Sequence, residues 1–66
     1  MAQIKVNTNY GEVTVRDAML NRDETHLDEG VELKLNDKVV CRLFGFSAES
    51  FEDDAELVET YLEMYL

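Results

Sequence analysis

The sequence predicts an α+β domain: a small antiparallel sheet of two hairpins, with a long amphipathic C-terminal helix packed on one face, in the order ββ(α)ββα. Apolar and polar residues alternate over the first fifteen residues and again between residues 31 and 43, as in strands with one covered face. Between residues 47 and 66 the apolar residues recur at helical spacing instead. The 66 residues allow one small core, so we expect a single domain, 1–66.

The first hairpin is expected close to the N-terminus. Pairing Ile4 with Val15 and Val6 with Val13 gathers four apolar side chains on one face of the sheet. This register leaves residues 9–10 as a two-residue turn, and the Asn-Tyr-Gly sequence at this point is typical of turns.

Residues 16–30 allow two interpretations. Thr14, followed by Asp17, can cap a short helix over residues 16–22, or the stretch can be irregular. The polar residues 23–30 are expected to form an exposed loop, with Leu27 held on the core. The sequence GEVTV at 11–15, followed by a helix, resembles the start of ubiquitin-like β-grasp domains, and the resemblance concerns topology alone.

The second hairpin depends on the length of its turn. A three-residue turn pairs apolar residues on one strand with apolar residues on the other: Leu35 with Val39, Leu33 with Cys41, and Val31 with Leu43. It also places Glu32 opposite Arg42 on the polar face. A two-residue turn would place Lys38 and Arg42 opposite apolar residues, so we predict the three-residue turn. Val40, Phe44 and Phe46 make the last strand apolar on its second face too, which fits either a central strand or a partner surface.

The C-terminal segment, Ser47–Leu66, is predicted to be one helix, and it holds most of the net charge. It contains seven of the fifteen acidic residues and none of the six basic ones. Ser47 and Ser50 are both candidate N-caps. Four glutamates at helical spacing are expected to form one stripe, which we call the predicted glutamate ridge: Glu52, Glu56, Glu59 and Glu63.

Charge and composition exclude several functions. A formal net charge of −9 disfavours direct binding to nucleic acid or to an anionic membrane and favours a basic protein surface as partner. The single cysteine cannot form an internal disulfide, and neither a signal peptide nor a transmembrane stretch is visible, so a cytoplasmic protein is expected. No nucleotide loop, nucleophile elbow or dinucleotide fingerprint is present, so we predict neither an enzyme nor a cofactor.

No catalytic or metal-binding residue is predicted. His26 stands among acidic residues, but the sequence DETHLDEG at 23–30 lacks the ligand spacing of a calcium loop and the additional His or Cys of a zinc site. We therefore expect a surface histidine. Cys41 falls on the inward face of its strand and has no histidine neighbour in sequence, so we expect a core thiol.

Two functions remain. In the first, the protein is an inhibitor or regulator of the phage or mobile-element type, such as an anti-CRISPR protein, that occludes a basic nucleic-acid site on a nuclease or CRISPR-type effector. Successive carboxylates of the predicted glutamate ridge would lie about 6 Å apart, near the phosphate spacing of a nucleic-acid strand, with Tyr61 and Tyr65 as anchors. In the alternative, it is a homodimeric structural or adaptor module assembled through Tyr61 and Phe44, and its charge only keeps it dissolved.

Overall fold

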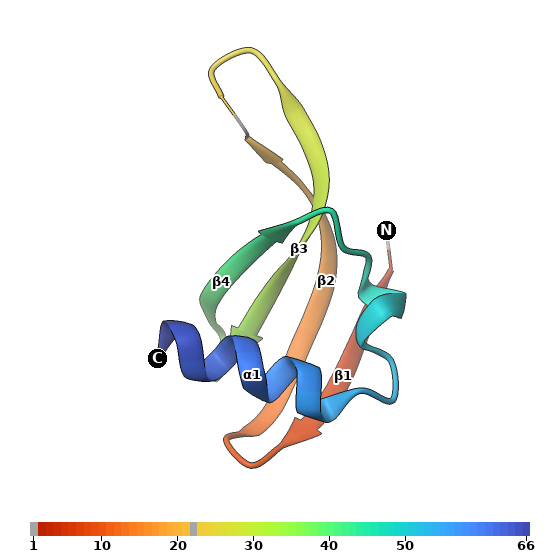
Figure 1. Cartoon of the computed structure of the whole chain (residues 1–66), viewed down its shortest axis with the longest axis vertical. Helices are drawn as coiled ribbons and strands as arrows, with labels where there is room; N and C mark the ends of the chain where they lie inside the picture. Colours follow the sequence, from red (N-terminus) through yellow and green to blue (C-terminus); the bar gives the residue numbers. More distant parts are fainter. Residues whose placement is uncertain (1, 22) are drawn as a thin grey trace.

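A computed structural model describes residues 2–21 and 23–66. Four antiparallel strands form one sheet in the order β1-β2-β3-β4, and the helical segments lie together on one face of it (Figure 1). The elements are β1 (Gln3–Thr8), β2 (Gly11–Asn21), β3 (Leu27–Leu35), β4 (Lys38–Phe44), the 3-10 helix η1 (Ala48–Phe51) and the helix α1 (Ala55–Tyr65). The α+β class and the small antiparallel sheet are confirmed.

The first hairpin has the predicted register. Ile4 pairs with Val15 and Val6 with Val13, and the turn consists of residues 9–10. The Thr8 hydroxyl closes the turn, because it donates to the carbonyl oxygen of Gly11 at 2.8 Å. The alternation of apolar residues therefore specifies this register correctly, since a slip by one residue would turn every valine to the polar side.

The helix predicted over residues 16–22 is wrong. β2 continues through this stretch to Asn21, and β3 begins as early as Leu27. Residue 22, the predicted helix end, lies outside the described residues. A seven-residue helix is too short to be stable alone, whereas pairing with β3 supplies backbone hydrogen bonds along the strand. Because no helix follows the first hairpin, the resemblance to β-grasp domains also fails.

The β2–β3 hairpin projects beyond the other two strands (Figure 1). Pairing with β1 extends along β2 only to Arg16, and pairing with β4 reaches back along β3 only to Gly30. We call the projecting residues 18–21 and 23–29 the finger. Leu27 is 58% exposed on the finger, so the prediction that it is held on the core is wrong.

The second hairpin has a two-residue turn and a bulge in one strand. Asn36 and Asp37 form a two-residue turn, and both have positive φ, as the tightest hairpin turns require. The predicted three-residue turn is therefore wrong. The extra residue is Val40, a bulge in β4, so Leu35 pairs with Lys38 and not with Val39 as predicted. Beyond the bulge the predicted pairs are present: Leu33 with Cys41, Glu32 with Arg42, and Val31 with Leu43.

The single long helix is also wrong, because the segment is divided into η1 and α1. Between them the chain turns at Asp53, which has a left-handed φ of 58°, a conformation that Asp tolerates better than most residues. The Asp54 carboxylate then accepts a hydrogen bond from the backbone N–H of Leu57 at 3.1 Å and caps α1. Ser47 precedes η1 without a capping hydrogen bond, and Ser50 lies inside η1.

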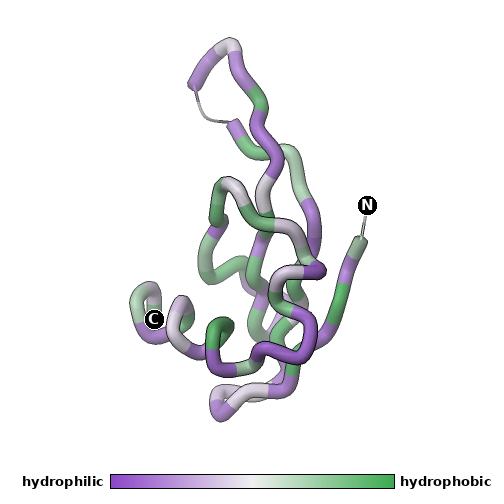
Figure 2. The backbone as a smooth tube through the Cα atoms, turned by 45° about the vertical axis from the view of Figure 1, so that its right-hand side comes forward, coloured by the Kyte–Doolittle hydropathy of each residue, from purple (hydrophilic) through white to green (hydrophobic). Residues whose placement is uncertain are grey.

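The core lies between the covered face of the sheet and the helical segments. It consists of Val6, Val13, Val15, Val31, Leu33, Cys41, Leu43, Ala48, Phe51, Val58 and Leu62. Hydrophobic and hydrophilic segments alternate along the chain in Figure 2, as the strand pattern predicts. Cys41 is a core thiol, as predicted, and burial raises its pKa. None of the helices in the described residues is long and apolar enough to cross a lipid bilayer.

Candidate interaction surface

The structure separates the members of the predicted glutamate ridge. Glu52 ends η1 and precedes the turn at Asp53, so it does not lie on α1. Glu56, Glu59 and Glu63 do lie on α1, but their environments differ. A continuous four-glutamate stripe on one helix is therefore absent.

Two of these glutamates contact the turn between β1 and β2. The Glu59 carboxylate accepts a hydrogen bond from the backbone N–H of Asn9 at 2.7 Å. Partial desolvation, the negative charge of Glu63 and a hydrogen bond to Glu63 raise the pKa of the Tyr10 hydroxyl, and the charge of Glu59 adds to this effect. Glu59 thus anchors α1 on the first hairpin, and Glu63 lies near the Tyr10 hydroxyl. No local sequence pattern indicates this contact, because it joins residues about fifty positions apart.

The remaining acidic residues of the C-terminal segment form a compact surface, which we call the acidic elbow. It spans η1, the turn and the start of α1, and its exposed carboxylates are those of Glu49, Glu52, Asp53, Asp54 and Glu56. Within the described residues, the ion pairs involve Glu12, Glu32 and Asp23, and none involves the elbow. Five carboxylates at this density create a negative field that attracts a cationic surface.

The predicted aromatic anchors do not form one patch. Tyr61 is half-buried and packs edge-on against Phe46 and Phe51, with ring centroids 5.7 and 6.3 Å away, so it is a core residue. Tyr65 is 53% exposed at the end of α1. Phe44 is 40% exposed and pairs with Gly30, which by strand alternation places it on the sheet face opposite α1.

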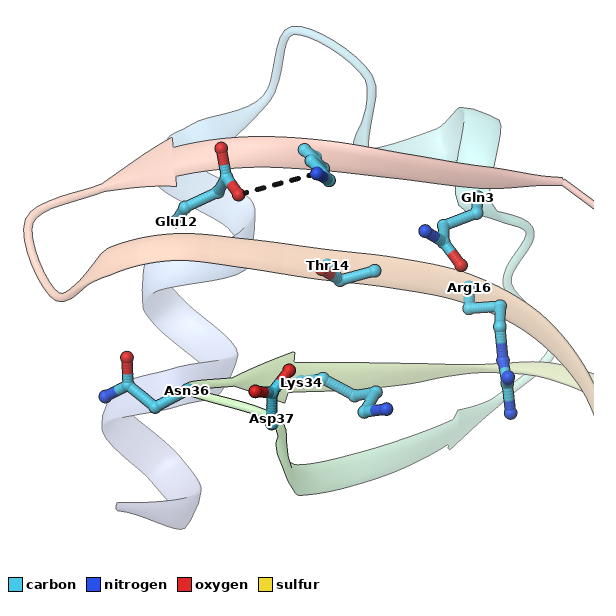
Figure 3. Close-up of a pocket in the computed structure, with 8 residues that line it drawn as sticks. Gln3, Glu12, Thr14, Arg16, Lys34, Asn36 and Asp37 are labelled. Atoms are coloured by element: carbon cyan, nitrogen blue, oxygen red, sulfur yellow. Dashed lines mark ion pairs between the residues drawn. The ribbon is translucent and has the colours of Figure 1, made fainter.

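None of the described residues forms a layer over the sheet face opposite α1, and we call this face the open face (Figure 3). Two rows of polar residues cross it, Gln3–Arg16–Glu32–Arg42 and Lys5–Thr14–Lys34. An open hollow of about 440 Å³ lies over the face, lined mainly by residues of these rows together with Glu12, Asn36 and Asp37. The two rows thus carry charge of both signs, and Phe44 adds an exposed apolar side chain to the open face.

Glu32 organises the first row. It is only 8% exposed, and its carboxylate accepts a hydrogen bond from Arg16 Nη2 at 2.9 Å, while Arg42 Nε lies 3.5 Å from its second oxygen. The two guanidinium groups compensate a carboxylate that would otherwise be costly to bury. Glu32 therefore holds both arginines at fixed positions on the sheet.

His26 lies in the exposed turn of the finger. Its Nδ1 is 2.9 Å from the Asp23 carboxylate, which also accepts hydrogen bonds from the backbone N–H groups of Thr25 and His26. Mainly the Thr25 N–H, and then the His26 side chain, lower the pKa of Asp23. His26 is a surface residue, as predicted. Across residues 2–21 and 23–66 no three potential ligands converge on a metal position.

Comparison of the chain with protein-family models, with curated proteins and with solved structures found no match. Its function therefore has to be inferred from the geometry of its own surfaces.

Proposed function

We propose that the protein is a small acidic inhibitor or regulator that binds a basic surface of another protein through the acidic elbow. The favoured partner is a cytoplasmic nucleic-acid enzyme, such as a nuclease or a CRISPR-type effector, whose cationic site the elbow would occlude. The observation that carries this proposal is the set of five exposed carboxylates at residues 49–56, without an ion pair to any described residue. Enzyme activity is not part of the proposal.

The shape of the elbow supports local occlusion of a binding site. Its carboxylates are supplied by a 3-10 turn, a left-handed residue and a helix start, so they spread over a rounded corner of the molecule. The backbone at this corner is fixed on both sides, because Phe51 is fully buried and Asp54 caps α1. Prearranged charges cost less ordering entropy on binding than charges on a mobile tail.

The elbow is tested by removing its charge while keeping its shape. A variant with Glu49→Gln, Glu52→Gln and Glu56→Gln loses three exposed carboxylates and leaves the Asp54 cap intact. The matched control, with Glu24→Gln, Glu29→Gln and Asp37→Asn, changes the net charge equally, at exposed positions outside the elbow. Any effect of overall charge is then common to both variants.

The assay is retention of nucleic-acid enzymes from a native lysate on the immobilised protein, followed by elution with salt or with free duplex DNA. We expect the wild type and the control to retain the same enzymes, and DNA to displace them because both bind one cationic site. The elbow variant should retain at least tenfold less. Equal retention by all three proteins, or failure of DNA to compete, would refute the proposal.

A second function is favoured by the exposed end of α1. Met64, Tyr65 and Leu66 are 66%, 53% and 65% exposed, and consecutive apolar residues of this kind are typical of interface cores. In this alternative the protein is a homodimeric structural or adaptor module. Replacing Tyr65 and Leu66 with Ser would then abolish a dimer seen by sedimentation, while the elbow variant would leave it intact.

A further inference from the structure

Basic residues are concentrated on the open face, which borders the elbow at Lys5, since Lys5 and Asp53 line one hollow. Four of the six basic side chains lie there, those of Lys5, Arg16, Lys34 and Arg42. They stand against three carboxylates, those of Glu12, Glu32 and Asp37. The elbow, by contrast, carries five carboxylates and no base. The open face thus has a small net positive charge, and the elbow is strongly negative.

Some cations of the open face form ion pairs within the chain, and others are left to bind a partner. Arg16 and Arg42 share one carboxylate, so the Arg16–Glu32–Arg42 cluster retains a net positive charge. The Arg16 Nε–H is buried and has no acceptor within the described residues. Lys34 has no ion pair with a described residue, and the 3.9 Å contact between Lys5 and Glu12 is exposed and weak. Carboxylates of a partner can therefore pair with the ammonium groups of Lys5 and Lys34.

We propose that the open face binds the acidic elbow of a second copy of this chain, in a head-to-tail arrangement. Charge complementarity identifies this occupant, because the elbow offers a dense group of carboxylates and the open face most of the bases. The two surfaces differ, so each bound copy still presents one free surface of each kind. Such an interface is heterologous and extends into chains unless its geometry closes a ring.

This self-association goes beyond the proposed function and competes with it, since both use the elbow. A copy whose elbow is docked on a neighbour cannot bind another basic partner. Dilution or a stronger cationic partner releases the elbow. Head-to-tail assembly thus keeps the protein in a form whose elbow is covered and cannot inhibit a partner.

The net charge of −9 gives the assembly a characteristic salt dependence. At about 0.01 M salt the Debye length is about 30 Å, comparable with the molecule, whose extents are 37 × 22 × 19 Å, so whole-molecule repulsion opposes association. At about 0.15 M the Debye length falls to about 8 Å, and only surfaces in contact interact. At about 1 M the contact attraction is screened as well. Self-association should therefore be strongest at intermediate salt.

Two variants with one surface reversed in each provide the test. Lys5→Glu with Lys34→Glu reverses the open face and spares both arginines that compensate Glu32. Glu52→Lys with Glu56→Lys reverses the centre of the elbow at exposed positions. Neither variant should self-associate alone, but their mixture should form a one-to-one dimer, because each retains one intact surface. The four substitutions together keep the net charge of −9 but leave both surfaces net negative, so this protein should not self-associate.

Sedimentation velocity across a concentration series, at the three salt concentrations, measures the association of the wild type, of each variant and of their mixture. We expect the mixed variants to associate at least tenfold more tightly than either alone, and circular dichroism checks that each is folded. A wild type that remains monomeric at all three salt concentrations would overturn the proposal. So would assembly that both variants retain alone, which would assign it to the apolar end of α1. A wild type that self-associates but retains no nucleic-acid enzyme from the lysate would refute the proposed function and leave this inference standing.

Discussion

Replacing Glu32 with Gln tests whether one carboxylate organises the open face. Glu32 is 8% exposed and contacts two arginines, at 2.9 Å from Arg16 and 3.5 Å from Arg42. Gln keeps the size of the side chain and one acceptor but removes the charge, so the two guanidinium groups then repel each other without compensation. The substitution should therefore destabilise the fold without leaving a cavity.

The size of the effect follows from the exposure of the partners. The side chains of Arg16 and Arg42 are 44% and 59% exposed, so solvent screens each pair and the loss should total about 1–2 kcal/mol. A domain of this length has a free energy of unfolding of roughly 3–10 kcal/mol. In a domain this small, each kcal/mol lowers the melting temperature by about 4–8 °C, so the shift should be about 5–15 °C.

Thermal unfolding followed by circular dichroism at pH 7 measures this shift. Glu12→Gln is the matched control, because it removes the same charge from an exposed pair with Lys5 at 3.9 Å and should change stability by less than about 0.5 kcal/mol. If the Glu32 and Glu12 variants have the same melting temperature, Glu32 does not hold the two arginines in place, and the description of the open face is wrong.

Three further outcomes are expected. Asp54→Ala should cost about 1 kcal/mol by removing the cap of α1, whereas Ser47→Ala, which removes no capping bond, should melt as the wild type does. Glu63→Gln should move the pKa of Tyr10 down towards its ordinary value, as read from phenolate absorbance, and an unchanged titration would contradict their contact. Because burial raises the pKa of Cys41, its protonated thiol favours the folded state fully below pH 9 and progressively less as the pH rises further. Urea unfolding at pH 8 and 10 should show this decline, and Cys41→Ala should remove it.

Local patterns predicted the strands well where one face is covered. The alternation around Val6 and Val13 specified the first hairpin, and the opposition of Glu32 and Arg42 specified the second one beyond its bulge. The turn itself was missed, because a two-residue turn followed by a bulge restores the same pairing as a three-residue turn. Sequence pattern alone does not distinguish these two solutions.

The candidate site was only partly predictable. Helical spacing predicts one continuous helix that includes Glu52. In the structure Asp53, in the left-handed conformation, separates Glu52 from α1. The engagement of Glu59 with Asn9 depends on a tertiary contact that no local pattern encodes. What the sequence did indicate is that the C-terminal segment is acidic throughout, and in the structure that property is concentrated at the elbow.

Whether the elbow is the surface that meets a cationic partner is tested most directly by amide chemical-shift mapping. An oligolysine peptide is titrated into the ¹⁵N-labelled protein at low salt, where electrostatic contacts are strongest. The amides of residues 49–56 should shift first and furthest, and the shifts should disappear in the three-Gln elbow variant. Shifts centred on the finger, or spread evenly over all acidic residues, would contradict the assignment of the elbow.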